Sequence, residues 1–176
     1  MSSDSTPEKQ FKIVKKLLQD GVDGDKQAAK RAHEKLLRLR ETQPHHALIE
    51  AYYGSSLALL SRDAVKLVEK EEKALESLEV LNQAVEMDPN EKEIRLLRGS
   101  VCLHLPESYF YSSRIAIEDF TFLLDRYQQD SNYLTHNQVR RVLRKLSKAY
   151  QNSGNPAKAN EVSQRLASMY PKKKDD

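Results

Sequence analysis

The chain contains a single cysteine, no tryptophan and few residues that interrupt regular secondary structure. Its 176 residues include only 5 glycines and 6 prolines. One cysteine, Cys102, cannot close an intramolecular disulfide or form a two-cysteine metal pair, so we expect a buried thiol in a reducing compartment. The residues that fill the sequence, such as leucine, alanine, glutamate and lysine, are good helix formers. The sequence therefore predicts an all-α protein.

Long apolar runs and a strong charge of one sign are also missing. No window approaches the roughly 18 apolar residues of a membrane span, and the amino terminus MSSDSTPEKQ has no apolar signal core. The 29 Lys and Arg against 26 Asp and Glu leave a net charge of +3, too small to make nucleic acid the default partner. We expect a cytoplasmic protein with a disordered segment 1–5, one domain over residues 6–171 and a charged tail 172–176.

Capping residues, prolines and apolar periodicity predict the helices along the chain. Thr6 with Pro7 is typical of a helix start, Thr135 and Asn155 begin later helices, and Asn90 opens a possible capping box with Glu93. The predicted helices are Thr6 to Gly21, a stripe from Ala28 to Leu39 ending at Pro44, His45 to Leu60, Asp63 to Asp88 with Val68 facing inward, Asn90 to His104, one through Ile115 and Leu124, Thr135 to Asn152, and Pro156 to Met169.

Small and apolar residues recur at identical offsets before three prolines. Ala32, Leu36, Leu39 and Pro44 are repeated as Ser77, Leu81, Ala84 and Pro89, and again as Ala159, Ser163, Leu166 and Pro171. Two glycines, Gly54 and Gly99, stand in the interior of predicted helices, where glycine costs about 1 kcal/mol against alanine. Close packing between helices would compensate for that cost. The pattern predicts a repeated pair of closely packed helices.

This pattern resembles the tetratricopeptide repeat, a helix-turn-helix unit of about 34 residues. The stretch from Arg140 to Pro171 matches it best, with Ser147 and Ser163 as mild departures, and the units fall at about 6–44, 45–89, 90–131 and 135–171. The resemblance implies a right-handed α-solenoid of antiparallel helix pairs, about eight helices in all.

The resemblance also implies a concave groove lined by the first helix of each unit. Applied to this sequence, it gives a groove that is apolar with a basic end and binds a peptide or helix of a partner protein. We expect an acidic, amphipathic partner segment and an adaptor or co-chaperone-like role. The family's clamp for chaperone carboxyl termini is not expected, because Ala51, Ser55 and Leu97 occupy its positions. The candidate groove residues are Leu48, Ala51, Ser55, Leu96, Ser100, Leu103, Arg141, Arg144, Lys148 and Gln151.

Two alternatives stay open for the basic helix at 138–151. Arg141, Arg144 and Lys148 are either a binding surface or an ordinary solvated helix face. Five cations between Arg140 and Lys148 also make nucleic acid or an acidic surface the alternative partner, although no aromatic residues are interleaved for base stacking. The partner and the oligomeric state are not determined by the sequence.

Catalytic and metal-binding patterns are not found in the sequence. The five histidines show no metal-ligand spacing and are interpreted as isolated surface residues, and no nucleophile, base and acid set is apparent. We expect no enzyme activity, metal or cofactor. The aromatic connection Tyr109 to Tyr111 is either packed beneath the helices or exposed as a contact for a partner.

Overall fold

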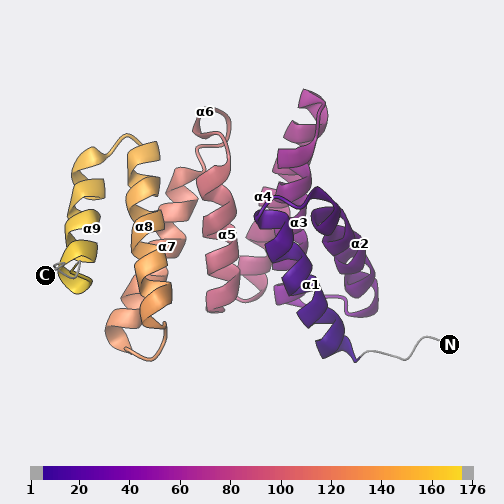
Figure 1. Ribbon diagram of the computed structural model, residues 1–176, viewed down its shortest axis with the longest axis horizontal. Helices are drawn as coiled ribbons and strands as arrows, with labels where there is room; N and C mark the ends of the chain where they lie inside the picture. Colours follow the sequence, from indigo (N-terminus) through magenta and orange to yellow (C-terminus); the bar gives the residue numbers. More distant parts are fainter. Residues whose placement is uncertain (1–5, 172–176) are drawn as a thin grey trace, which may run out of the picture. The chain divides into compact units, whose positions relative to one another are not determined.

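The computed structural model describes residues 6–171, without the side chains of Pro7 and Tyr109, and the regular secondary structure of this part is entirely helical. The predicted disordered segment 1–5 and charged tail 172–176 lie outside the described residues. The chain forms two compact units, Met1–Ile94 and Arg95–Asp176, and the boundary between them falls within a helix. The first contains α1 (Pro7–Val22), α2 (Lys26–Thr42), α3 (Ala47–Asp63) and α4 (Leu67–Met87). The second contains most of α5 (Lys92–His104), α6 (Glu107–Phe110), α7 (Ser113–Gln129), α8 (His136–Asn152) and α9 (Pro156–Met169) (Figure 1).

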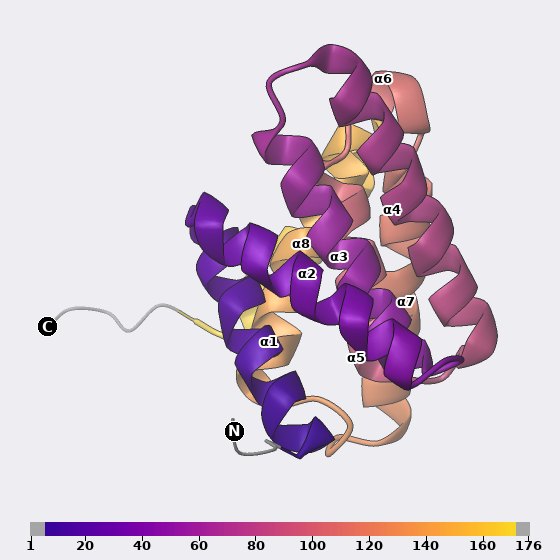
Figure 2. The ribbon, with the colours of Figure 1, turned by 90° about the vertical axis from the view of Figure 1, so that its right-hand side faces the viewer.

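Consecutive helices pack against one another within each unit. In the first unit α1 packs on α2, α2 on α3, and α3 on α4, the last pair lying side by side in both ribbon views (Figures 1 and 2). In the second unit α7 packs on α8 and α8 on α9. No strand occurs among residues 6–171. The predicted all-α class with packed neighbouring helices is therefore confirmed, and it is consistent with an α-solenoid.

Local capping explains where most of these helices begin. The Thr6 hydroxyl accepts a hydrogen bond from the backbone N–H of Lys9. Thr135 and Gln138 form the reciprocal capping box, and the Asn155 side chain accepts from the N–H of Lys158. These three predicted helix starts are confirmed.

Other predicted boundaries and faces are wrong. The helix expected from Asp63 begins at Leu67 instead, because Ala64 is extended and ends α3. Val68, expected to face inward, is 64% exposed in the first turn of α4. Gly21 does not cap α1 but lies within it, and an added Cβ there would be 3.0 Å from Leu59.

Helix α5 and the aromatic connection also differ from expectation. The helix begins at Lys92 rather than directly after Asn90, and the Glu91 side chain accepts a hydrogen bond from the N–H of Glu93. The connection after Pro106 forms the one-turn helix α6. Tyr111 that follows has a positive φ of 47° and is 70% exposed, while the burial of Tyr109 lies outside the described side chains.

The three helix pairs α3–α4, α5–α7 and α8–α9 share one kind of close contact. A Cβ added at Gly54 would lie 2.8 Å from Cγ of Leu81, and one added at Gly99 would lie 2.9 Å from Cε1 of Phe120. In the last pair the hydroxyl groups of Ser147 and Ser163 are hydrogen-bonded at 2.9 Å. These are equivalent positions in the predicted repeats. The close packing that the mid-helix glycines predicted is therefore present.

The single thiol, Cys102, lies in the core of the second unit. It is 1% exposed, and burial raises its pKa to about 12. Because the thiolate is the reactive form, we expect native protein at neutral pH to react with iodoacetamide at least about tenfold more slowly than unfolded protein. Labelling followed by mass spectrometry, with and without denaturant, measures this ratio; equal rates would contradict the buried placement.

Candidate functional site

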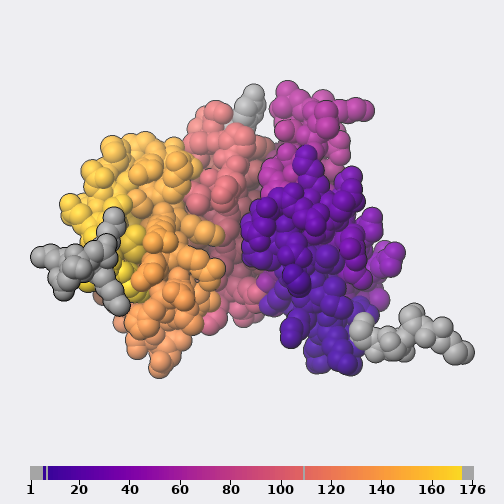
Figure 3. All heavy atoms as spheres, in the orientation of Figure 1, coloured from indigo at the N-terminus to yellow at the C-terminus, as the bar shows by residue number. Residues whose placement is uncertain are grey.

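One basic surface of the second unit lies where α5 and α8 meet. Nζ of Lys145 donates a hydrogen bond of 2.6 Å to Oγ of Ser100, and Nδ2 of Asn152 donates one of 3.4 Å to the carbonyl of Leu103. These bonds place the two helices next to each other along this surface, with α8 and α5 both visible from one side (Figures 1 and 3). We define the α5–α8 surface by Leu96, Ser100, Leu103, Arg141, Lys145, Lys148 and Asn152.

Lys145 is the central cation of the α5–α8 surface. Burial lowers its pKa, and the positive charge of Arg141, one helical turn away, lowers it further. Lys148 follows within the next turn and is exposed. Among residues 6–171, no carboxylate forms an ion pair with any of these three cations. The surface therefore carries positive charge that the described part of the chain does not neutralise.

A second basic region lies beside this surface on α8, against α9. A pocket of about 440 Å³ is lined by Arg140, Arg144, Ser163, Leu166, Ala167, Tyr170 and Pro171. The Arg140 guanidinium stacks over the Tyr170 ring at 4.7 Å from its centroid, and Nε of Arg140 is buried without a hydrogen-bond partner among the described residues. We call this the α8–α9 pocket. It combines two arginines with a largely apolar wall.

The structure gives two of the three predicted basic residues different surroundings. Arg144 lines the α8–α9 pocket with Arg140, whereas Arg141 is close enough to Lys145 on the α5–α8 surface to lower its pKa. Lys148 lies one turn after both Arg144 and Lys145. The sequence placed Arg141, Arg144 and Lys148 together because they are three and four residues apart. Helix geometry allows both groupings, and only the positions of α5 and α9 separate them. Gln151 is exposed on α8.

The candidate groove residues of α3 and α5 have different degrees of exposure. Leu96, Ser100 and Leu103 on α5 are partly exposed. Ala51 has no exposed surface, and Ser55 is 6% exposed with its hydroxyl bonded to the carbonyl of Ala51. Leu48 on α3 is also partly exposed. Neither Ala51 nor Ser55 is accessible to a partner in this structure.

Side chains from α1 and α5 surround the neighbouring part of α3. The Tyr52 ring lies 5.1 Å from that of Phe11, and its hydroxyl donates to the carboxylate of Glu93. Nζ of Lys15 binds the same carboxylate at 2.7 Å and lies over both rings. These side chains cover Tyr52, which is 7% exposed.

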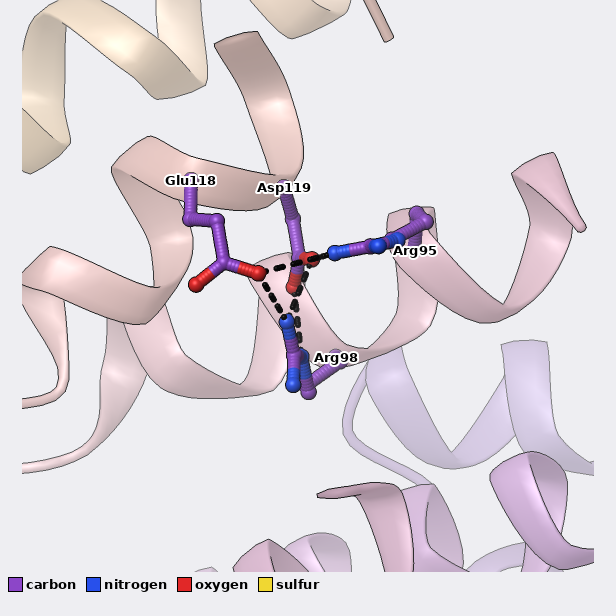
Figure 4. Close-up of polar contacts among 4 residues, drawn as sticks. All are labelled: Arg95, Arg98, Glu118 and Asp119. Carbon is purple, nitrogen blue, oxygen red and sulfur yellow. Dashed lines mark hydrogen bonds and ion pairs between the residues drawn. The ribbon is translucent and has the colours of Figure 1, made fainter. Parts of the chain in front are cut away.

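The sequence analysis missed a buried ionic cluster that joins α5 to α7 (Figure 4). Asp119 is fully buried and accepts hydrogen bonds from Arg95 at 2.9 Å and from Arg98 at 2.7 and 2.8 Å. Glu118 accepts from the same two arginines at 2.9 and 3.1 Å. The sequence offered one signal for this cluster. Arg95 and Arg98 are three residues apart on a helix that also carries Ile94, which is buried. We define these four residues as the Asp119 cluster.

One histidine is not the isolated surface residue that was expected. His33 is partly buried, bonds Oγ of Ser56 through Nδ1 at 3.0 Å and stacks on Tyr53. Burial lowers its pKa. Within residues 6–171 there is no group of three or more His, Cys, Asp and Glu side chains arranged to hold a metal ion. In the same range, no helix has the length and apolar character that crossing a bilayer requires.

Similarity within the chain is clearer than similarity to other proteins. The close contact of Gly54 with Leu81 recurs between Gly99 and Phe120 in another helix pair. No model of a known protein family matches the chain, and a search of curated proteins found no significant similarity.

Proposed function

We propose that this chain is a divergent tetratricopeptide-like repeat protein that binds an acidic segment of a partner protein at the α5–α8 surface. The repeat assignment is supported by contacts at equivalent positions of three helix pairs. Gly54 meets Leu81, Gly99 meets Phe120, and Ser147 bonds Ser163, although the lengths of the intervening segments differ. Repeats of this kind commonly serve as binding surfaces for other proteins.

The observation that carries the proposed binding site is the environment of Lys145. Its ammonium group is held by the Ser100 hydroxyl rather than by a carboxylate, and burial together with Arg141 disfavours its charge. An incoming carboxylate would stabilise that charge and gain a charge-assisted hydrogen bond. Leu96 and Leu103 offer partly exposed apolar contacts nearby on α5. The combination suits an amphipathic segment with acidic side chains.

Charge reversal on this surface tests the proposal. We expect Arg141→Glu with Lys148→Glu to weaken capture of protein partners from a lysate of the source organism by at least about tenfold, because like charges then face the acidic segment. The matched control reverses Arg31 and Arg38, two exposed arginines of α2. Circular dichroism checks that both variants keep their helices. Retention of the same partners by the Arg141 and Lys148 variant would refute this site.

The protonation of Lys145 gives a second readout of the same proposal. Because binding requires the ammonium form, partner affinity should fall as the pH rises through the lowered pKa of Lys145. Bound carboxylate should raise that pKa, which NMR titration of the labelled lysine detects. A Lys145 pKa that is the same with and without a captured partner would count against direct contact.

Nucleic acid or another acidic surface remains the alternative partner. The structure favours this alternative less than the sequence does, because two of the α8 cations, Arg140 and Arg144, line the α8–α9 pocket. Binding of arbitrary RNA or DNA at low salt, falling steeply as salt is added, would support the alternative. Absence of such binding leaves the protein partner.

A further inference from the structure

The outward face of α4 is unusual because it combines exposed aliphatic and acidic side chains. Val68 and Leu75, two helical turns apart, are 64% and 58% exposed. Glu71, Glu72 and Glu79 are exposed on the same face, and none forms a hydrogen bond or ion pair with a described residue. Val65 and Leu67, just before this face, are 95% and 67% exposed. We define the α4 face by Val68, Glu71, Glu72, Leu75 and Glu79.

The α8–α9 pocket has the opposite character. Arg140 and Arg144, one helical turn apart, form no ion pair with any carboxylate of residues 6–171. Nε of Arg140 is buried and lacks a hydrogen-bond partner among these residues. Leu166 and Tyr170 supply the apolar wall. The pocket therefore holds two guanidinium groups without a carboxylate partner among the described residues.

We propose that the α4 face of one copy of this chain docks in the α8–α9 pocket of a second copy. Leu75 then packs against the apolar wall, while the carboxylates of Glu71 and Glu72, one turn before it, reach the arginines of the pocket. Each carboxylate is then one helical turn from the apolar contact. Exposed aliphatic side chains are covered in the same step, which supplies the hydrophobic part of the association.

The second copy is the chosen occupant because the chain itself carries the complementary chemistry. The acidic and apolar α4 face and the basic and apolar pocket belong to different parts of one molecule, so the contact is heterologous. Each copy can then offer one face to a partner and one pocket to another, and association proceeds head to tail. Because the charged groups lie near the surface, the association should weaken as salt is added.

Sedimentation of the full chain over a wide concentration range tests this proposal. At low salt, the average mass should rise above the monomer mass of 20.3 kDa as concentration increases, and should fall when salt is added. Arg140→Glu with Arg144→Glu should weaken self-association at least about tenfold, and so should Glu71→Lys with Glu72→Lys. Reversal of the exposed α2 residues Arg31 and Arg38, or of Glu34 and Glu41, provides controls with the same changes in charge.

A mixing experiment separates this arrangement from other modes of association. The arginine variant retains an intact α4 face and the glutamate variant an intact pocket, so an equimolar mixture should associate more strongly than either variant alone. If the double arginine variant loses helicity, Arg144→Glu alone must still weaken association. A wild-type chain that stays monomeric at every concentration, variants that associate like wild type, or a mixture that stays monomeric would each overturn the proposal.

Different variants test the partner-binding proposal and the self-association proposal, so either can fail without the other. The partner-binding variant changes Arg141 and Lys148, and the self-association variant changes Arg140 and Arg144, which line the α8–α9 pocket. Loss of partner capture only in the first variant supports the α5–α8 surface, whether or not the chain self-associates. Loss of self-association only in the second supports the α8–α9 pocket.

Discussion

Replacing Asp119 by alanine should destabilise the protein by about 3 to 5 kcal/mol, the largest effect that we expect from a single substitution. The carboxylate is fully buried between Arg95 and Arg98, which are 8% and 7% exposed. Removing it leaves two guanidinium groups buried beside each other without their buried counter-charge, while Glu118, which pairs with both, is exposed. Denaturant unfolding monitored by circular dichroism measures the loss.

Two control variants separate the buried charge from the exposed one. Glu118→Gln should cost no more than about 1 kcal/mol, because its side chain is 62% exposed and solvent screens its ion pairs. Replacing Arg95, Arg98 and Asp119 together by apolar residues of similar volume should restore most of the stability, since no unpaired charge remains buried. Equal losses from the Asp119 and Glu118 variants would contradict this account of the cluster.

Gly54→Ala should destabilise the first unit by about 1 to 3 kcal/mol, although alanine is the better helix former by about 1 kcal/mol. An added Cβ would lie 2.8 Å from Cγ of Leu81 and 3.2 Å from the carbonyl oxygen of Ser77. The Ser77 hydroxyl also donates a bond of 2.6 Å to the Gly54 carbonyl, which holds α3 and α4 at this distance. Denaturant unfolding of the variant gives the change in free energy.

A double-mutant cycle tests whether the contact with Leu81 is the cause. In a Leu81→Ala background the obstructing atoms are gone, so Gly54→Ala should become neutral or stabilising. The coupling between the two substitutions should then be at least about 1 kcal/mol. If Gly54→Ala costs the same in both backgrounds, the steric explanation is wrong.

The sequence was most informative where the determinants are local or repeated. Thr135 with Gln138 forms the capping box, and Asn155 caps the last helix, because these side chains bond to backbone groups within one turn. Gly54 signalled a close approach because an interior glycine is otherwise costly in a helix. Its position within the predicted repeat then indicated which part of α4 it contacts.

The candidate site was less predictable because it depends on which helices flank α8. Arg141 and Arg144 are only three residues apart, and a single helix does not determine that one faces α5 and the other α9. Arg95 and Arg98 resembled ordinary surface cations until α7 placed Asp119 between them. Nonlocal neighbours therefore decide which charges are structural and which are available for binding.

The close contact shared by the three helix pairs also limits how repeats can be exchanged. Glycine is matched with a large side chain at Gly54 and Leu81, whereas two small side chains meet at Ser147 and Ser163. A helix carrying serine at this position would collide with Leu81, and one carrying glycine would leave a void beside Ser163. Helices transplanted between repeats must therefore be moved as matched pairs, so the interchangeable module is a helix pair rather than a helix.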